Sequence, residues 1–172
     1  MTAALALCLA FFSGTIPVSA KAAKSKKPVA QSSDRRFLDF GDGTILDSKT
    51  KLMWMKNDYW QTENKWASWY TAVEFAQRMN NKKFAGHSDW RLPTPDEAKS
   101  LYERQRVNVD KDGDKIFIDP IFPKGAGWAT WTQAEKGDKA IVVSFKDDGE
   151  QTYQDKISGK DAFLRLVRGP GS

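Results

Sequence analysis

The stretch Asp89-Trp90-Arg91-Leu92-Pro93-Thr94-Pro95-Asp96-Glu97 decides the fold, because it joins an alternating apolar segment to a strong helix start. In its second half, Thr94 stands at an N-cap position, Pro95 at the first helical position and Glu97 three residues after the cap. This arrangement is a capping box, in which the threonine and glutamate side chains bind each other's backbone N–H groups. We predict a helix that begins here and runs to about Gln105.

In the first half of this stretch, apolar and charged residues alternate. Trp90 and Leu92 are expected to point into the core, while Asp89 and Arg91 satisfy neighbouring backbone groups or form an ion pair. A catalytic interpretation would use Asp89 as a base and Arg91 as an oxyanion clamp. The alternation favours the structural role.

A second helix is predicted earlier in the chain, from the N-cap Ser68 to about Asn80. Its apolar residues recur at steps of three and four and form one stripe: Trp69, Ala72, Val73, Ala76 and Met79. Apolar segments bounded by turn residues predict strands at 37–40, 44–46, 52–55, 140–145 and 163–167, with Arg165 and Arg168 facing outward. The pattern predicts an α+β fold, with two helices packed on short antiparallel sheets.

Residues 1–20 have the composition of a signal peptide. They carry no charged side chain, are largely apolar and end in Val18-Ser19-Ala20, a small-residue cleavage pattern. A retained anchor is the alternative. The only cysteine, Cys8, lies in this segment, so cleavage would leave no disulfide, thiolate metal site or cysteine nucleophile. We therefore expect an extracytoplasmic protein, either periplasmic or secreted.

The excess positive charge lies in one short segment. The chain has 27 Lys and Arg against 22 Asp and Glu, for a net charge of +5. Residues 21–36 hold six basic residues and one acidic residue, so residues 37–172 are neutral. Because residues 21–36 lack large apolar side chains, they are predicted to be a basic disordered arm. This arm is a solvated spacer, or it makes weak contact with an anionic polymer or a membrane surface. Export argues against nucleic acid as a partner.

Aromatic residues set among polar ones are candidate ligand-binding residues. A predicted loop holds Tyr59, Trp60 and Trp66, while Trp128 and Trp131 follow two glycines later in the chain. Aromatic rings stack on the C–H faces of sugars, and polar neighbours orient the hydroxyl groups. The same residues could instead plug a satellite core beneath the loop, and the sequence leaves both interpretations open.

An acidic segment is the candidate metal site. Oxygen-bearing side chains at alternate positions, followed by a glycine, fit a calcium loop with the ligands Asn108, Asp110, Asp112, Asp114 and Asp119. The segment departs from an EF-hand, because Asn opens it, Asp closes it and Pro120 blocks an exiting helix. One Ca²⁺ ion is the single cofactor that the sequence suggests, and a solvated acidic turn is the alternative.

The sequence lacks the motifs of common enzyme classes. His87 is the only histidine, so a multi-histidine metal site cannot form. The sequence contains neither a Gly-x-Ser-x-Gly nucleophile turn nor a glycine-rich phosphate loop. A glycosidase-type carboxylate pair remains open, but no spacing favours one. We therefore do not expect an enzyme, and a carboxylate-based hydrolase is the minor alternative.

Several segments resemble one known family, in that family's order. They are 41–44, 52–54, 86–94, 128–132 and 167–169, of which Asp-Trp-Arg-Leu-Pro-Thr at 89–94 is the most specific. On these residues, the domain 37–172 resembles the Lcl C-terminal domain family. The resemblance implies a C-type-lectin-like fold, in which the first and last strands pair and the two helices flank the sheets. It also implies a bacterial extracytoplasmic module, since the namesake module binds sulfated polysaccharides and is implicated in adhesion.

These observations together predict an exported, non-catalytic binding module. Its expected partner is a glycan, with sulfated and otherwise anionic glycans included, or a protein of the bacterial envelope. A structural subunit of an envelope assembly is the alternative function. The sequence is compatible with an oligomer.

Overall fold

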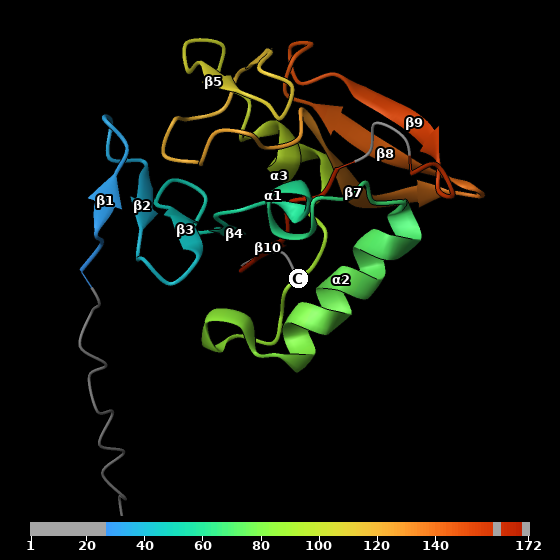
Figure 1. Ribbon diagram of the computed structural model, residues 1–172, viewed down its shortest axis with the longest axis horizontal. Coiled ribbons are helices and arrows are strands. Elements are labelled where there is room, and N and C mark those ends of the chain that lie inside the picture. Colours follow the sequence, from blue (N-terminus) through green and yellow to red (C-terminus); the bar gives the residue numbers. More distant parts are fainter. Residues whose placement is uncertain (1–26, 160–162, 170–172) are drawn as a thin grey trace, which may run out of the picture.

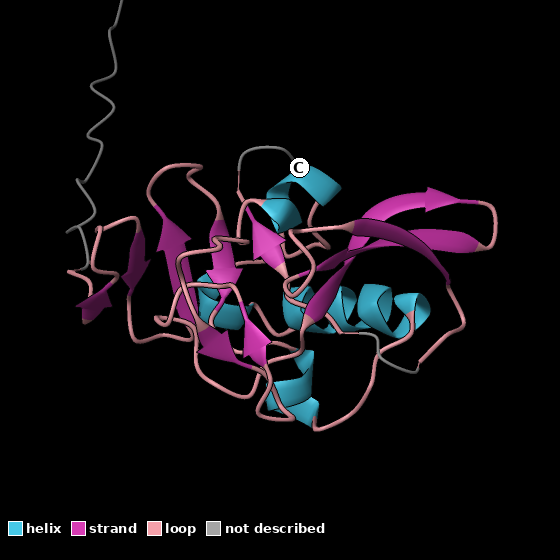
Figure 2. Ribbon diagram, turned by 90° about the horizontal axis from the view of Figure 1, so that it is seen from above, coloured by secondary structure: helices cyan, strands magenta, loops and turns pink. Residues whose placement is uncertain are grey.

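The computed structural model describes residues 27–159 and 163–169, which form an α+β fold (Figures 1 and 2). The predicted signal peptide and the first part of the predicted arm, residues 21–26, lie outside the described residues. In the described part of the chain, none of the helices has the length and apolar character needed to cross a membrane.

The larger sheet has five short antiparallel strands in the order β1-β2-β3-β4-β10. These strands are β1 (Ala30–Gln31), β2 (Phe37–Asp39), β3 (Thr44–Asp47), β4 (Met53–Met55) and β10 (Val167–Arg168). The expected pairing of the first and last predicted strands is wrong, because β2, which corresponds to the strand predicted at 37–40, pairs with β1 and β3 rather than with β10. The strand β10 pairs with β4 instead, where Ile45, Trp54 and Val167 align in one buried row across three strands. The C-type-lectin-like arrangement therefore stays a prediction.

A second antiparallel sheet contains β7 (Ala129–Lys136), β8 (Lys139–Ser144) and β9 (Gln151–Asp155), in that order. The apolar strand predicted at 140–145 corresponds to β8. The strand β9 was not predicted, because its polar sequence shows no apolar alternation. A small two-stranded sheet consists of β5 (Asn108–Val109) and β6 (Lys115–Ile116).

Both predicted helices are present, although one is shorter than expected. The helix α2 (Trp69–Asn81) begins at Ser68, whose hydroxyl accepts from the Thr71 N–H at 3.1 Å. The helix α3 (Pro95–Lys99) begins with the predicted capping box but ends at Lys99 rather than near residue 105. Its end follows from the Ser100 hydroxyl, which donates to the Glu97 carbonyl at 2.7 Å and competes with helical bonding.

The first helix, α1 (Tyr59–Glu63), lies where a loop was predicted. Asp58 and Gln61 form a capping box at its start, and Asn64 ends it in the left-handed conformation. A 3₁₀ turn, η1 (Phe84–Gly86), follows α2. The helix α1 shows that a polar, aromatic segment can be helical when a cap at each end fixes it.

The core consists of two apolar clusters. One lies between α2 and the β7–β8 hairpin and contains Phe75 and Trp131, while the other lies against the five-stranded sheet and contains Trp54 and Phe122. Figure 1 shows the two larger sheets on opposite sides of the molecule, with α1 and α3 between them. Trp90 and Leu92 are buried as predicted and belong to the cluster that contains Phe75 and Trp131. The segment before α3 is therefore part of the core.

Arg165 was expected to face outward, and this expectation is wrong. The side chain is only 2% exposed and donates to the carbonyl groups of Met55, at 2.7 Å, and Lys56. Its guanidinium also lies over the Phe122 ring, 4.7 Å from the ring centroid, which is a cation–π contact. Burial raises the pKa of Asp58, although the Arg165 charge opposes this effect. Arg165 thus satisfies the backbone carbonyl groups at the end of β4 and of the residue that follows it.

The predicted boundary between arm and domain at residue 36 is also wrong. The strand β1 pairs with β2, and Ser32 is buried, with its hydroxyl accepting from the Phe37 N–H at 2.9 Å. Arg36 contacts Asp47 at 2.6 Å and also pairs with Glu103. Backbone pairing and charged hydrogen bonds hold residues 30–36 in place. The lack of large apolar side chains in this segment was therefore a poor predictor of disorder.

Candidate binding site

Two of the five predicted ligand-binding aromatic residues belong to the core. Trp131 is 0% exposed, and its indole N–H donates to the Ala67 carbonyl at 2.7 Å. Tyr59 is 6% exposed and packs edge-on against Phe75, with ring centroids 5.0 Å apart. Neither ring offers a face to a ligand, so these two predictions are wrong.

The other three predicted residues, Trp60, Trp66 and Trp128, are half-buried around Phe163. Their ring centroids lie 6.4, 5.0 and 5.9 Å from that of Phe163, respectively. Gly127 permits this packing, because a Cβ atom there would lie 2.0 Å from the Phe163 ring. These rings therefore form a satellite core, which is the second of the two interpretations of the sequence.

Lys111 covers part of this satellite core. Its Nζ atom lies 4.7 Å from the Trp60 ring centroid and 4.6 Å from that of Trp66. The same ammonium contacts the Asp112 carboxylate at 2.7 Å. We call Trp60, Trp66, Trp128, Phe163 and Lys111 the aromatic–lysine cluster. Its cation already has an acid and two ring faces as partners.

The five predicted calcium ligands do not converge on one point. Asp110 lies 2.9 Å from Lys146, Asp112 contacts Lys111, and Asp119 lies 3.5 Å from Arg106. Asp114 also lies 2.9 Å from Lys146, and the Asn108 amide donates to the Phe122 carbonyl at 2.8 Å. Within residues 27–159 and 163–169, no group of three or more His, Asp or Glu side chains could hold a metal ion.

The Lys146 ammonium occupies the acidic side of this turn. Burial alone would raise the pKa of Asp110, but the hydrogen bond from Lys146 and two backbone N–H groups keep this pKa below its ordinary value. Those N–H groups belong to Asp112 and Asp114, each 2.9 Å from the Asp110 carboxylate. This geometry fits the alternative to a calcium loop, an acidic turn. Lys146 is the ion-pair partner of two of its acids, Asp110 and Asp114.

A surface hollow of about 630 Å³ lies where the turn before β2 meets the turn after β3. We call it the β2–β3 hollow, and it is lined by Asp34, Arg35, Arg36, Ser48, Lys49, Thr50, Ser100, Tyr102 and Glu103. The two turns are joined by a hydrogen bond from the Ser48 N–H to the Arg36 carbonyl at 2.8 Å. The hollow therefore has a fixed backbone frame.

The acids of the β2–β3 hollow are engaged by cations of the chain. Asp34 pairs with Arg106 at 2.8 Å, and Glu103 pairs with Arg36. The Ser32 hydroxyl and the Arg36 N–H also bind the Asp34 carboxylate and lower its pKa to about 2. Arg36 holds a third acid, Asp47, beneath the hollow. Each of the three carboxylates therefore has an arginine of the chain as its ion-pair partner.

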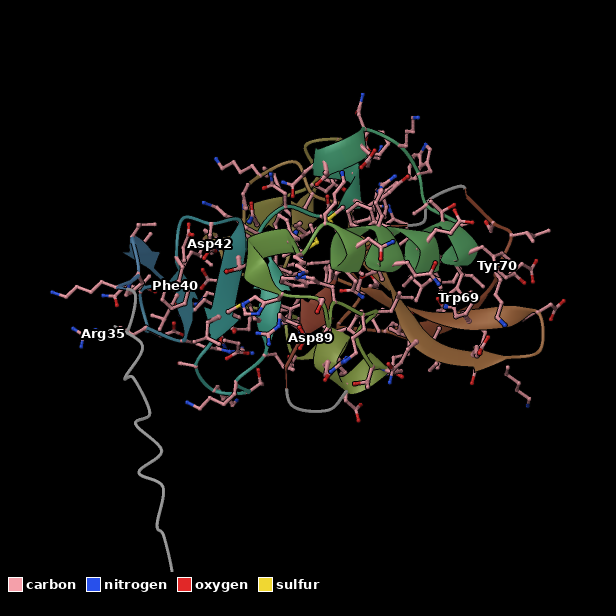
Figure 3. The ribbon with its side chains drawn as sticks, turned by 90° about the horizontal axis from the view of Figure 1, so that it is seen from below. Arg35, Phe40, Asp42, Trp69, Tyr70 and Asp89 are labelled. Atoms are coloured by element: carbon pink, nitrogen blue, oxygen red, sulfur yellow. The ribbon has the colours of Figure 1, made fainter. Side chains whose placement is uncertain are left out.

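Two cations on the wall of the β2–β3 hollow have no such partner. Arg35 and Lys49 are exposed, and neither forms an ion pair with a described residue. Arg35 adopts a positive φ of 62°, the left-handed conformation, in the turn between β1 and β2. Figure 3 shows the Arg35 side chain extending from the molecule beside β1 and β2. Arg35 falls in the segment predicted from the sequence to be a disordered arm, and no sequence pattern marks Lys49 as a site residue.

A second hollow, of about 470 Å³, adjoins the first across the Asp34–Arg106 ion pair. Its charged lining residues are Asp39, Lys56, Arg106 and Asp119. Asp39 and Lys56 lie 2.6 Å apart, so the charges here are also largely paired. Arg35 and Lys49, which are exposed and form no ion pair with a described residue, thus line the β2–β3 hollow and not this second hollow.

The model of the Lcl C-terminal domain family matches residues 43–168. No curated protein and no solved structure matches the chain. The matched range contains α2, the segment before α3, the aromatic–lysine cluster and one wall of the β2–β3 hollow. The chain therefore belongs to the Lcl C-terminal domain family.

Proposed function

We propose that this protein is an extracytoplasmic, non-catalytic binding module that holds an anionic glycan in the β2–β3 hollow. The observation that carries the proposal is the pair of unpaired cations, Arg35 and Lys49, above three acids that are already neutralised. An anion placed here gains two positive partners and meets no uncompensated carboxylate. A sulfate or carboxylate group on a sugar supplies such an anion.

The remaining lining of the hollow suits the polar part of a sugar. The Thr50 hydroxyl accepts from the Leu52 N–H at 3.3 Å and also hydrogen-bonds the Asp47 carboxylate, so its oxygen forms part of a fixed polar wall. Ser48 and Tyr102 add further polar atoms to the wall. Sugars carry many hydroxyl groups, so their recognition depends on several such donors and acceptors rather than on one strong contact.

The basic segment 21–36 fits the same proposal. Its last two residues, Arg35 and Arg36, both line the hollow, and four lysines precede them in the sequence. A polymeric anion in the hollow could therefore also approach the preceding lysines. Each Lys or Arg near an anionic surface contributes about 1 kcal/mol, an interaction that salt weakens.

The test is affinity for a sulfated polysaccharide such as heparin, measured with protein purified after expression of the full chain. The double variant Arg35→Ala/Lys49→Ala should bind about thirtyfold more weakly, because two charges of about 1 kcal/mol each are lost. The control Lys115→Ala/Lys136→Ala removes the same charge from exposed positions elsewhere. Equal weakening by both variants would overturn the proposed site, and no binding by the natural chain would overturn the ligand class.

A further inference from the structure

The β7–β8–β9 sheet has one covered edge and one open edge. On the β7 side, the Trp131 N–H donates to the Phe163 carbonyl at 2.9 Å, and the Gln133 N–H donates to the Pro93 carbonyl at 2.8 Å. On the other side, β9 is the last strand of the sheet. Figure 1 shows β9 at the outer margin of the molecule, on a part of the sheet that projects from the body.

The register identifies which backbone groups of β9 face outward. At the two ends of the β8–β9 ladder, Ser144 N–H donates to Glu150, at 2.9 Å, and Lys156 N–H donates to Asp138, at 2.8 Å. Hydrogen-bonded pairs alternate along an antiparallel ladder, so Thr152 and Gln154 face β8. The N–H and C=O groups of Gln151, Tyr153 and Asp155 therefore point away from the sheet.

Most of these outward groups are free for a further strand. The Asp155 carbonyl accepts from the Ser158 N–H at 2.9 Å, but no backbone bond between described segments reaches Gln151 or Tyr153 from outside the sheet. Native sheets usually protect such an edge with lysine, proline or a bulge. The strand β9 contains no lysine or proline, and the bulge of this sheet lies in β7, between Trp131 and Glu135.

We infer that β9 pairs antiparallel with β9 of a second copy of this chain. The register with the most outward bonds is centred on Tyr153, which then lies opposite the partner's Tyr153. This register forms four backbone hydrogen bonds without disturbing the Asp155 turn: two between the tyrosines, and one from each Asp155 N–H to the Gln151 carbonyl of the other copy.

The side chains of β9 favour a second copy over another strand, because the edge is complementary to itself. In the centred register, each Gln151 amide lies opposite an Asp155 carboxylate, its natural hydrogen-bond partner. The two Asp155 carboxylates lie at opposite ends of the paired strands, and each keeps Lys139 at 3.9 Å. Tyr153 is 54% exposed and gains an aromatic partner across the two-fold axis.

Light scattering coupled to size-exclusion chromatography, over a range of protein concentrations, tests this dimer. The natural chain should form dimers as its concentration rises. Tyr153→Lys should weaken dimerisation about tenfold or more, because it removes the aromatic pair and places two ammonium groups opposite each other. Thr152→Lys is the matched control, since it adds the same charge opposite Gln154 and should leave the dimer intact.

A second variant tests the backbone contact itself. Tyr153→Pro removes an outward N–H but no β8–β9 bond, so it should abolish dimers and leave the circular dichroism spectrum unchanged. A natural chain that stays monomeric at millimolar concentration would overturn the inference. Dimers that persist in Tyr153→Lys would do the same, because they would require a different interface.

Discussion

The aromatic–lysine cluster and the β2–β3 hollow both present positive charge near aromatic and polar groups, but they differ in how that charge is used. In the cluster, Lys111 already contacts Asp112 and two indole rings. In the hollow, Arg36 and Arg106 neutralise every acid, and Arg35 and Lys49 remain without an ion pair among the described residues. A charge that the fold does not use is available to a ligand. The comparison therefore supports a structural role for the cluster and the proposed binding role for the hollow.

The largest expected effect tests the structural role of the cluster. Gly127→Ala places a Cβ atom 2.0 Å from the Phe163 ring, at a residue whose N–H donates to the buried Asp58 carboxylate at 2.6 Å. Overpacking of this kind should lower the free energy of unfolding by about 3 kcal/mol, measured by urea denaturation. Gly159→Ala is the control, because no atom lies within 4 Å of a Cβ there. Similar stability of both variants would show that Phe163 is not held in the cluster.

Removing one ring should separate stability from binding. Trp66→Ala deletes the ring that packs on Phe163 and Trp60 and supports Lys111. Because Trp66 is only half-buried, the free energy of unfolding should fall by about 2 kcal/mol, less than for a fully buried tryptophan. Heparin affinity of the folded variant should be unchanged. A variant of normal stability that no longer binds heparin would reverse the assignment and restore Trp66 as a ligand residue.

Removing only the charge of the cluster should have a smaller effect. Lys111→Met keeps an unbranched apolar side chain against the two indoles but loses the cation–π contacts and the Asp112 pair. The free energy of unfolding should fall by about 1 kcal/mol, and heparin affinity should stay the same. Lys115→Met, at an exposed position nearby in the sequence, serves as the control and should change neither quantity. Loss of affinity in Lys111→Met alone would mean that this charge serves the ligand.

The smallest effect concerns the acids of the hollow. Hydrogen bonds from Ser32 and the Arg36 N–H lower the pKa of Asp34 from 3.8 to about 2. A carboxyl whose folded-state pKa is depressed stabilises the fold fully above its unfolded pKa, and this contribution is lost as the pH falls toward 2. Asp34→Asn should therefore lose less stability than the natural chain between pH 4 and pH 2, measured by urea denaturation. Parallel losses in the two proteins would exclude a depressed pKa at Asp34.

Local signals in the sequence predicted local structure well. The capping box at Thr94 and the cap at Ser68 gave the starts of α3 and α2, and the alternation at Trp90 and Leu92 gave their burial. An equivalent signal was missed at Asp58 and Gln61, whose capping box begins α1. These features depend on neighbours within a few residues, which is why sequence patterns contain them.

The candidate site depends on contacts that the sequence does not encode locally. Arg35 and Lys49 line one hollow because β2 and β3 pair. Neither forms an ion pair with Asp47 or Glu103, because Arg36 pairs with both of these acids. Composition likewise cannot tell the buried Trp131 from the half-buried Trp60, since both stand among polar residues. The sequence pattern of the predicted calcium loop likewise does not show that Lys146, from a distant part of the chain, pairs with Asp110.

The salt dependence of heparin affinity tests the central claim most directly. Binding of a polyanion releases about one counterion for each positive group engaged, so the logarithm of affinity falls linearly with the logarithm of salt concentration. The account predicts that Arg35→Ala/Lys49→Ala lowers this slope by about two, while Lys115→Ala/Lys136→Ala leaves it unchanged. A slope that is the same in the natural chain and in the Arg35→Ala/Lys49→Ala variant would contradict the account, because the two unpaired cations would then have no contact with the ligand.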